Sequence, residues 1–243
     1  MTVPVFYSEH IDPTASSLTL TGDEAHHATV RRVRPGEQVD VTDGRGRVAH
    51  CTVQRSERDA LECTLGSVED EAMPQPSLIV VQALPKGDRG EVAVETMTEV
   101  GVDRIVPWAA ARCVTRWKGE RGERSRRRWT AVSVASAKQA GRAWWPQVAE
   151  LVTTRALTDL LRTADGAIVL HEQAPTPLVR LSPPQSGSLV LVVGPEGGIG
   201  ADELDALTGA GAVPARLGPT VLRTSTAGTV AAGVVLAATQ RWS

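Results

Sequence analysis

A run of five apolar residues, Leu189-Val190-Leu191-Val192-Val193, is the sequence feature that most limits the fold of this chain. A strand with one solvated face alternates apolar and polar residues, so a strand without alternation is covered on both faces. The run leads directly into the glycine-rich segment 194–200, GPEGGIG, after which a helix is predicted to begin near Ala201. A buried strand, a glycine turn and a helix in succession indicate a parallel sheet with helices on both faces.

The same alternation of strands and helices extends over most of the second part of the chain. We predict further strands at residues 78–84, 104–108, 147–151, 167–170 and 212–217, with helices between them that include residues 89–100 and 226–240. The last helix is rich in Ala, Gly and Val and has no charge before Arg241. This composition predicts a buried helix, in the core or at a dimer interface. The fold class is therefore α/β.

The first part of the chain has a different pattern. Short segments at residues 3–7, 17–21, 38–42, 47–54 and 60–68 predict strands, and the turn-forming residues at 34–37 and 43–46 predict hairpins between them. Such strands predict a small β-barrel. The acidic, proline-containing stretch 69–76 has the composition of a linker. We therefore expect two domains, residues 1–72 and residues 73–243.

Composition excludes several classes of function. A chain of 243 residues that is 42% hydrophobic can build real cores, but its net charge of -2 is not that of a protein that coats nucleic acid. The cysteines lack metal-ligand spacing and the histidines do not cluster, so we expect reduced thiols and no metal site. The first ten residues include Glu9 and His10 and are not followed by an apolar run, so no targeting signal is expected. The apolar stretch 227–238 is shorter than the about 20 residues that a membrane span requires. These features predict a cytoplasmic protein without membrane contact.

Two glycine-containing loops are candidate ligand sites, at residues 194–200 and 217–223. In open parallel sheets, ligands bind beyond the carboxyl ends of the strands, where glycine allows close approach to the backbone. Acidic residues surround the first loop and disfavour a phosphate, and no dinucleotide-binding or P-loop pattern is present. They are Glu196, Asp202, Glu203 and Asp205. A plain strand-to-helix turn without a ligand remains the alternative.

Five segments, in this order and spacing, resemble the ribosomal RNA small subunit methyltransferase E family. They are residues 82–89 (QALPKGDR), 99–102 (EVGV), 137–142 (AKQAGR), 194–198 (GPEGG) and 217–224 (LGPTVLRT). Residues 26–31 (HHATVR) resemble the RNA-binding motif of the same family. The resemblance implies methyl transfer from S-adenosylmethionine to uracil N3 of 16S rRNA in the small ribosomal subunit. It also implies a homodimer, a PUA-like amino-terminal domain, and a SPOUT-type sheet with a carboxy-terminal trefoil knot, which is rare among protein folds.

The resemblance also implies roles for individual residues. The residues expected to bind the cofactor are Leu170, His171, Gly194, Glu196, Gly198, Leu217, Gly218 and Leu222. Arg223 is the candidate catalytic residue, because negative charge develops on the uracil oxygens when N3 loses its proton. A solvated salt-bridge partner is the alternative reading of Arg223. The general base stays open between His171 and Glu196, and the family pattern is not followed at Thr220 and Ser225, so neither receives a role.

Contacts with RNA are expected from local basic residues. The candidates are Arg31, Arg32, Arg34, Lys86, Arg89 and Arg142. One basic cluster in the first domain consists of Arg31, Arg32, Arg34, Arg45 and Arg47, and a second, residues 121–128, is expected to precede a helix. A solvated face is the alternative reading of each cluster. Trp144 and Trp145 are candidates either for stacking on bases or for packing in the core. Two rival functions remain: a SPOUT enzyme that methylates another RNA, such as the ribose 2′-hydroxyl of transfer RNA, and a non-catalytic RNA-binding protein of ribosome assembly.

Overall fold

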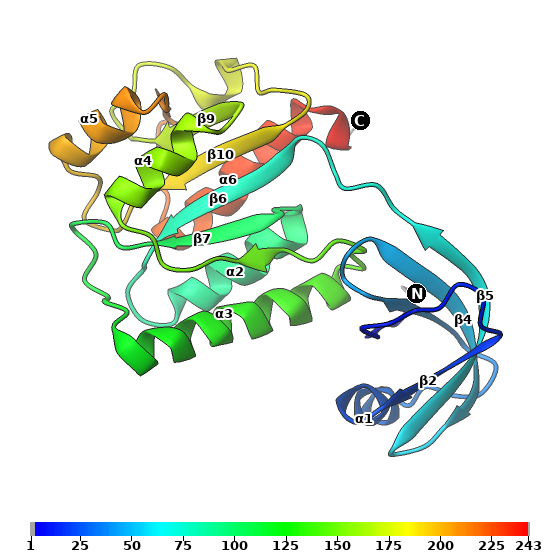
Figure 1. Cartoon of the computed structure of the whole chain (residues 1–243). Coiled ribbons are helices and arrows are strands. Elements are labelled where there is room, and N and C mark those ends of the chain that lie inside the picture. Colours follow the sequence, from blue (N-terminus) through cyan, green and yellow to red (C-terminus); the bar gives the residue numbers. More distant parts are fainter. Residues whose placement is uncertain (1–2, 243) are drawn as a thin grey trace. The chain divides into compact units, whose positions relative to one another are not determined.

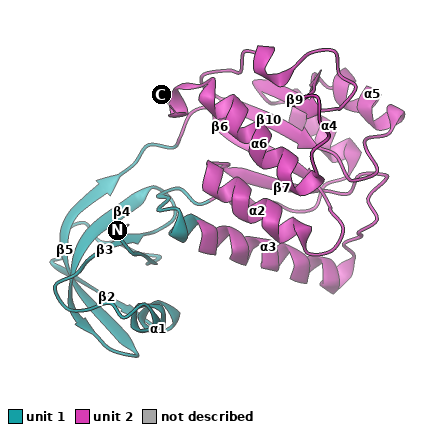
Figure 2. Cartoon of the chain, turned by 180° about the vertical axis from the view of Figure 1, so that it is seen from behind, with its two compact units in different colours: residues 1–73, 137–145 teal, residues 74–136, 146–243 magenta. Residues whose placement is uncertain are grey.

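The computed structural model describes residues 3–242, which form two compact units (Figure 2). The first unit consists of residues 1–73 and 137–145, and the second of residues 74–136 and 146–243. The chain therefore contributes to the first unit twice. The alternation of strands and helices did not assign the short segment 137–145 to this unit.

A curled five-stranded sheet forms the first unit, in the order β1-β3-β4-β5-β2 (Figure 1). Its strands are β1 (Val5–Tyr7), β2 (Ser17–Thr21), β3 (Gln38–Thr42), β4 (Arg47–Ser56) and β5 (Ala60–Asp70). All neighbours are antiparallel except β1 and β3. The predicted strands are thus present, and β5 extends to Asp70, into the stretch predicted to be a linker.

One helix of the first unit was not predicted, α1 (Asp23–Val30), which carries His26 and His27. Asp23 and Glu24 lie in its first turn, where carboxylates interact favourably with the helix dipole. Only Ala25 and Ala28 are buried, so this short helix has no apolar periodicity that a sequence pattern would reveal.

The hairpin turn between β3 and β4 explains why residues 137–145 join the first unit. Gly46 N donates to Ala143 O at 3.1 Å, and Trp145 N donates to Gly44 O at 3.0 Å. A Cβ atom at Gly44 would lie 2.7 Å from the Trp145 indole, and one at Gly46 would lie 2.6 Å from the Trp144 indole. Both glycines also have positive φ, 70° and 105°. The turn therefore requires glycine for its backbone and for its contact with the indoles.

A six-stranded parallel sheet forms the second unit, in the order β11-β9-β10-β6-β7-β8. The strands are β6 (Ser77–Ala83), β7 (Arg104–Trp108), β8 (Gln147–Val148), β9 (Gly166–Leu170), β10 (Ser188–Val193) and β11 (Val213–Ala215). Residues 189–193 of β10 are buried between β9 and β6, as the run without polar residues predicted. β8 is shorter than predicted.

Helices cover both faces of this sheet, with α2 and α6 on one face and α4 and α5 on the other (Figures 1 and 2). The helical elements are α2 (Arg89–Val100), α3 (Gly119–Gln139), α4 (Thr154–Arg162), α5 (Ala201–Gly209), α6 (Thr224–Ala237) and the 3-10 turns η1 (Leu178–Arg180) and η2 (Gln240–Trp242). The last three residues of α3 belong to the first unit. No helix within residues 3–242 is long and apolar enough to cross a membrane.

The small residues of α6 allow it to lie close to α2 and the sheet. A Cβ atom at Gly228 would lie 2.8 Å from Met97 Sδ of α2, and the hydroxyls of Thr229 and Thr96 are 2.6 Å apart. Met97 is fully buried. The prediction of a buried final helix is confirmed for the side of α6 that faces α2 and the sheet, whereas Val230 is 40% exposed. The helix also begins and ends earlier than predicted.

Candidate active site

The loops that follow β9, β10 and β11 lie at one edge of the sheet in the second unit. Leu170, the last residue of β9, pairs with Ala215 of β11, and Val169 pairs with Val192 of β10. The carboxyl ends of these adjacent parallel strands are therefore level. Leu170 ends β9, and the other residues predicted to bind the cofactor lie in the loops that follow these strands. The fold therefore brings all of them to the same edge of the sheet.

The loop 194–200 is anchored on two sides. Gly198 has a φ of 72°, and its N–H donates to Pro195 O at 2.9 Å, closing a tight turn that favours glycine. The Thr224 hydroxyl, at the start of α6, donates to Gly194 O at 2.8 Å. The Glu196 carboxylate accepts a hydrogen bond of 3.0 Å from Lys86 N, in the loop after β6. The loop is thereby connected to two other elements of the same unit.

Arg112 also holds this loop, and the sequence analysis did not identify it. Its Nη1 donates to Gly197 O at 3.1 Å, and a Cβ atom at Gly197 would lie 3.2 Å from Arg112 Cβ. Its guanidinium is also within 4 Å of where Cβ atoms would stand at Gly198 and Gly200. A single arginine in a loop has no sequence signal that separates this contact from an ordinary surface position.

The other two loops meet beside β11. His171 N donates to Ala215 O at 2.9 Å, while Leu178 N donates to Arg216 O and Arg216 N donates to Thr176 O. These bonds join the segment after β9 to the end of β11, where the resemblance places the trefoil knot. Beyond them, a Cβ atom at Gly218 would contact nothing within 4 Å. The backbone at Gly218 is thus open to a ligand.

The hydrogen bonding of His171 bears on its role as a base. Its Nδ1 lies 3.2 Å from Gln173 N and accepts that N–H. A neutral imidazole has one nitrogen that can accept, so the proton is on Nε2 in this arrangement. The lone pair that a general base would use is therefore occupied.

Arg223 is the N-cap residue of α6 and its side chain is exposed. Its carbonyl oxygen accepts the N–H groups of Thr226 and Ala227, which fixes the backbone. Its guanidinium forms no ion pair or hydrogen bond with any residue from 3 to 242. The salt-bridge reading is therefore not supported within that range. Thr220 is exposed and Ser225 is buried.

The acidic residues around α5 are less uniform than predicted. Glu203 is buried, and its Oε1 accepts Ala111 N at 3.0 Å and the Thr154 hydroxyl at 2.8 Å. It connects α5 to the segment after β7 and to α4 rather than facing a ligand. Asp202 and Asp205 are exposed. Among the described residues, no group of three acidic, histidine or cysteine side chains is arranged to hold a metal.

The candidate RNA-binding residues are divided between the units. Arg31, Arg32 and Arg34 are exposed at the end of α1 and in the loop after it, and the half-buried Arg142 lies in the segment 137–145. Lys86 and Arg89, in the second unit, lie in the loop before α2 and at its first position. The basic cluster 121–128 lies on α3 itself, so the expectation that it precedes a helix was wrong.

Trp144 and Trp145 pack within the first unit. Trp144 Nε1 donates to Glu71 O at 3.0 Å, and Trp145 Nε1 donates to Arg142 O at 3.1 Å. The Trp145 ring centroid is 4.9 Å from that of Tyr7. With Gly44 and Gly46 against their rings, both half-buried indoles take part in the packing of this unit.

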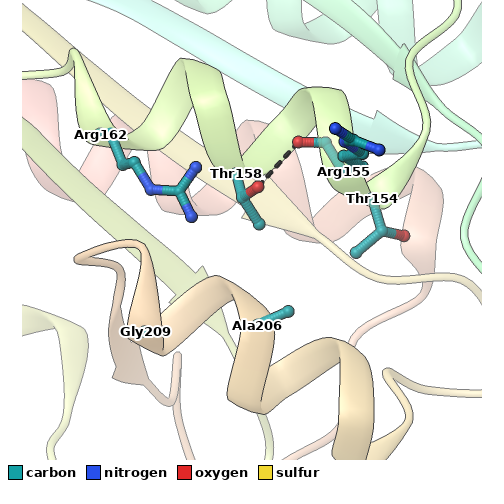
Figure 3. A pocket seen from close by; sticks show the side chains of 6 residues that line it. All are labelled: Thr154, Arg155, Thr158, Arg162, Ala206 and Gly209. Atoms are coloured by element: carbon teal, nitrogen blue, oxygen red, sulfur yellow. Dashed lines mark hydrogen bonds between the residues drawn. The ribbon is translucent and has the colours of Figure 1, made fainter.

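A separate hollow of about 450 Å³ lies between α4 and α5 (Figure 3). Arg155 and Arg162 line it from α4, and the Thr158 hydroxyl donates to Arg155 O at 2.7 Å. Arg162 is already paired with Asp159 at 2.7 Å. None of the residues that line this hollow belongs to the three loops, so it is distinct from the candidate active site.

Comparison with known proteins gives the family. The model of an RNA methyltransferase domain matches residues 72–236, and that of an RNA methyltransferase PUA domain matches residues 20–66. The chain is 47% identical to ribosomal RNA small subunit methyltransferase E of Mycobacterium tuberculosis, covering 100% of this chain and 94% of that protein. The chain belongs to the ribosomal RNA small subunit methyltransferase E family.

Other relatives agree with this membership. The family member from Bacillus subtilis is 30% identical over 88% of this chain and 87% of its own length. The crystal structure of the Neisseria gonorrhoeae member, bound to S-adenosyl methionine, superposes with a TM-score of 0.87 at 25% identity and covers 97% of this chain and 98% of that one. The SPOUT-type α/β fold with a PUA-like first domain, expected from the resemblance, is confirmed.

Proposed function

We propose that this protein transfers a methyl group from S-adenosylmethionine to N3 of a uridine in 16S rRNA of the small ribosomal subunit. The observation that carries the proposal is the convergence of the three loops at the carboxyl ends of β9, β10 and β11. Family membership and the named function of the relatives support the same reading. The two compact units are assigned as the RNA-binding and methyltransferase domains.

The residues at the three loops fit the chemistry of this cofactor. The backbone is open at Gly218 and tightly turned at Gly198, and the carboxylate of Glu196 lies in the same loop as Gly198. The Glu196 carboxylate disfavours a phosphate in this loop, and the nearby Arg112 guanidinium already donates to Gly197 O. S-adenosylmethionine has no phosphate, and its positive sulfonium makes its methyl group electrophilic. Leu170, Leu217 and Leu222, all half-buried, supply apolar contact surface.

Arg223 is assigned to the uracil. Its guanidinium is exposed at the start of α6 and has no partner within the described residues; the next residue, Thr224, binds Gly194 O. A cation at this place stabilises the negative charge that spreads onto uracil O2 and O4 as the N3 proton leaves. Since Nδ1 of His171 is occupied and Glu196 binds Lys86 N, neither of them is assigned as the base.

RNA contact is assigned to both units. Arg31, Arg32 and Arg34 present exposed guanidinium groups after α1, and Arg142 extends this set within the first unit. Lys86 and Arg89 lie next to the glycine loop in the second unit. Contacts of this kind with phosphates make binding decrease as salt concentration rises.

We further propose a cytoplasmic homodimer, because the small ribosomal subunit is its substrate and α6 and α2 leave apolar side chains exposed. Val92 of α2 is 50% exposed and Val230 of α6 is 40% exposed, on two helices that pack together. Neither a metal nor a membrane has a part in the proposed reaction.

The test is transfer of labelled methyl from S-adenosylmethionine to unmethylated 30S subunits, naked 16S rRNA and bulk transfer RNA, followed by nucleoside analysis. We expect N3-methyluridine in 16S rRNA. Label in transfer RNA would reassign the substrate. No label in any RNA, with no cofactor binding in a direct assay, would favour a non-catalytic role in ribosome assembly.

A further inference from the structure

A cavity of about 520 Å³ lies in the second unit, beside the loop that follows β6. Its walls come from that loop, the first turn of α2, residues 114–117 and the first turns of α3. We propose that this cavity binds one nucleotide of unpaired substrate RNA, with the base on its aromatic wall and the phosphate on its arginines. The inference rests on the proposed function and adds a substrate subsite to it.

The cavity lies next to the candidate active site, although no residue of the three loops lines it. Leu84 and Pro85, which line it, follow β6 at the same edge of the sheet as the loop after β10. The next residue, Lys86, donates its backbone N–H to Glu196 of that loop at 3.0 Å. A nucleotide in the cavity therefore lies beside the loops assigned to the cofactor.

The aromatic wall is formed by Trp117 and Trp129, whose ring centroids are 4.9 Å apart at 74°. Trp129 is buried at 3% exposure, while Trp117 is only half-buried and offers indole surface to the cavity. The Thr115 hydroxyl donates to Pro85 O at 2.7 Å, which joins this wall to the loop after β6. An indole fixed in this way can stack on any base of a single strand.

The cationic side of the cavity comes mainly from α3. Arg121, Ser125 and Arg128 line it and are spaced by four and three residues, so they share one face of the helix. Arg128 pairs with Glu91 at 3.1 Å, whereas Arg121 is exposed and forms no ion pair within the described part of the chain.

The remaining charged groups of the cavity do not cancel this cation. Arg116 donates to the carbonyl oxygens of Ala110 and Ala111, and no carboxylate of the described residues forms an ion pair with it. Asp88 and Glu91 also line the cavity, and Glu91 is the partner of Arg128. The three arginines thus exceed the two carboxylates, and an anion is favoured.

The same helix provides a matched control. Arg124 is exposed on α3, three residues from Arg121, and does not line the cavity, so it is assigned to the solvated face of the helix rather than to RNA. Arg121→Ala and Arg124→Ala therefore remove the same charge from the same helix, but only the first changes the cavity.

The first experiment measures methyl transfer to 30S subunits by the full-length variants. We expect Arg121→Ala to raise KM for the subunits about tenfold and to leave KM for S-adenosylmethionine unchanged, with Arg124→Ala within twofold of the wild type. Equal effects of the two substitutions would overturn the cavity as an RNA site while the proposed function stands.

The second experiment does not depend on turnover. Binding of fluorescently labelled tetrauridylate is measured with S-adenosylhomocysteine present, for the wild type and both variants, together with an abasic tetramer of the same charge. We expect Arg121→Ala to bind tetrauridylate about tenfold more weakly than the wild type does. We also expect the wild type to bind the abasic tetramer about tenfold more weakly than tetrauridylate. An Arg121-dependent preference for tetrauridylate without methylation of 30S subunits would retain the cavity site and refute the proposed function. Equal binding of the two probes would overturn the nucleotide site.

Discussion

At the scale of single residues, Arg223 is held by its backbone, and its guanidinium has no partner among residues 3–242. Its side chain is exposed at the start of α6, and its role is assigned to the transition state rather than to the fold. We expect Arg223→Ala to lower kcat about 100- to 1000-fold, with the affinity for S-adenosylmethionine and the melting temperature unchanged. Single-turnover methylation and calorimetric binding of the cofactor measure the two effects. Unchanged turnover would remove Arg223 from the mechanism.

Arg112 supports the loop 194–200 instead of the reaction. Its hydrogen bond to Gly197 O is charge-assisted, and the loss of such a bond allows the loop to move. We expect Arg112→Ala to weaken binding of S-adenosylmethionine about tenfold, since a less ordered loop must be ordered on binding. Arg104→Ala, at an exposed position of β7, is the control. Similar affinities of the two variants would show that the contact does not hold the loop.

Cys51 and Cys63, on neighbouring strands of the first unit, are protected thiols. Burial raises the pKa of Cys51 to about 12 and that of Cys63 to about 11. Because the thiolate is the reactive form, we expect no reaction with a disulfide reagent at pH 8 until the protein is denatured. Because these pKa values are raised in the folded state, the two neutral thiols contribute fully to the free energy of unfolding below the ordinary thiol pKa of 9.0. This contribution is lost as pH rises from 9.0 towards 12. Thiol titration and urea unfolding at pH 8 and pH 10.5 test both statements.

At the scale of elements, the contact between α6 and α2 depends on a missing side chain. A methyl group at Gly228 would contact the fully buried Met97, whose neighbours leave it little room. We expect Gly228→Ala to lower the free energy of unfolding of the second unit by about 1–3 kcal/mol. Gly209→Ala, in α5, would meet nothing within 4 Å and is expected to stabilise by about 0.4–1 kcal/mol. Urea denaturation measures both, and a neutral Gly228→Ala would contradict close packing at this site.

At the scale of the whole molecule, the two units cannot be separated by one cut. Residues 137–145 pack with residues 1–73, so removal of residues 1–73 alone exposes Trp144 and Trp145. We expect this truncation to aggregate, and the same truncation with both tryptophans changed to serine to remain monodisperse and to bind S-adenosylmethionine normally. Its affinity for 30S subunits should decrease at least about tenfold, because Arg31, Arg32 and Arg34 are lost. Light scattering, calorimetry and filter binding measure these properties, and full-rate methylation by the truncated protein would require another role for the first unit.

The sequence by itself determined the local features whose cause is local. The apolar run 189–193 specified a central strand because no polar residue could face solvent, and the small residues of α6 specified a buried helix. The order of the glycine motifs also indicated the family and the loops of the site. Every strand that the structure describes overlaps a predicted one, because hydrophobic periodicity and turn residues are properties of neighbouring positions.

Only the tertiary structure decided which distant groups meet. The bond of Arg112 to Gly197, the burial of Glu203 between Ala111 and Thr154, and the return of residues 137–145 to the first unit all join segments far apart in the chain. Helix α1 was not predicted because it is too short and too polar to show a helical repeat of apolar residues. Its position depends on contacts with β2 and β5. Side chains with the same local pattern can lie in solvent or in a core, and the difference is set by what packs against them.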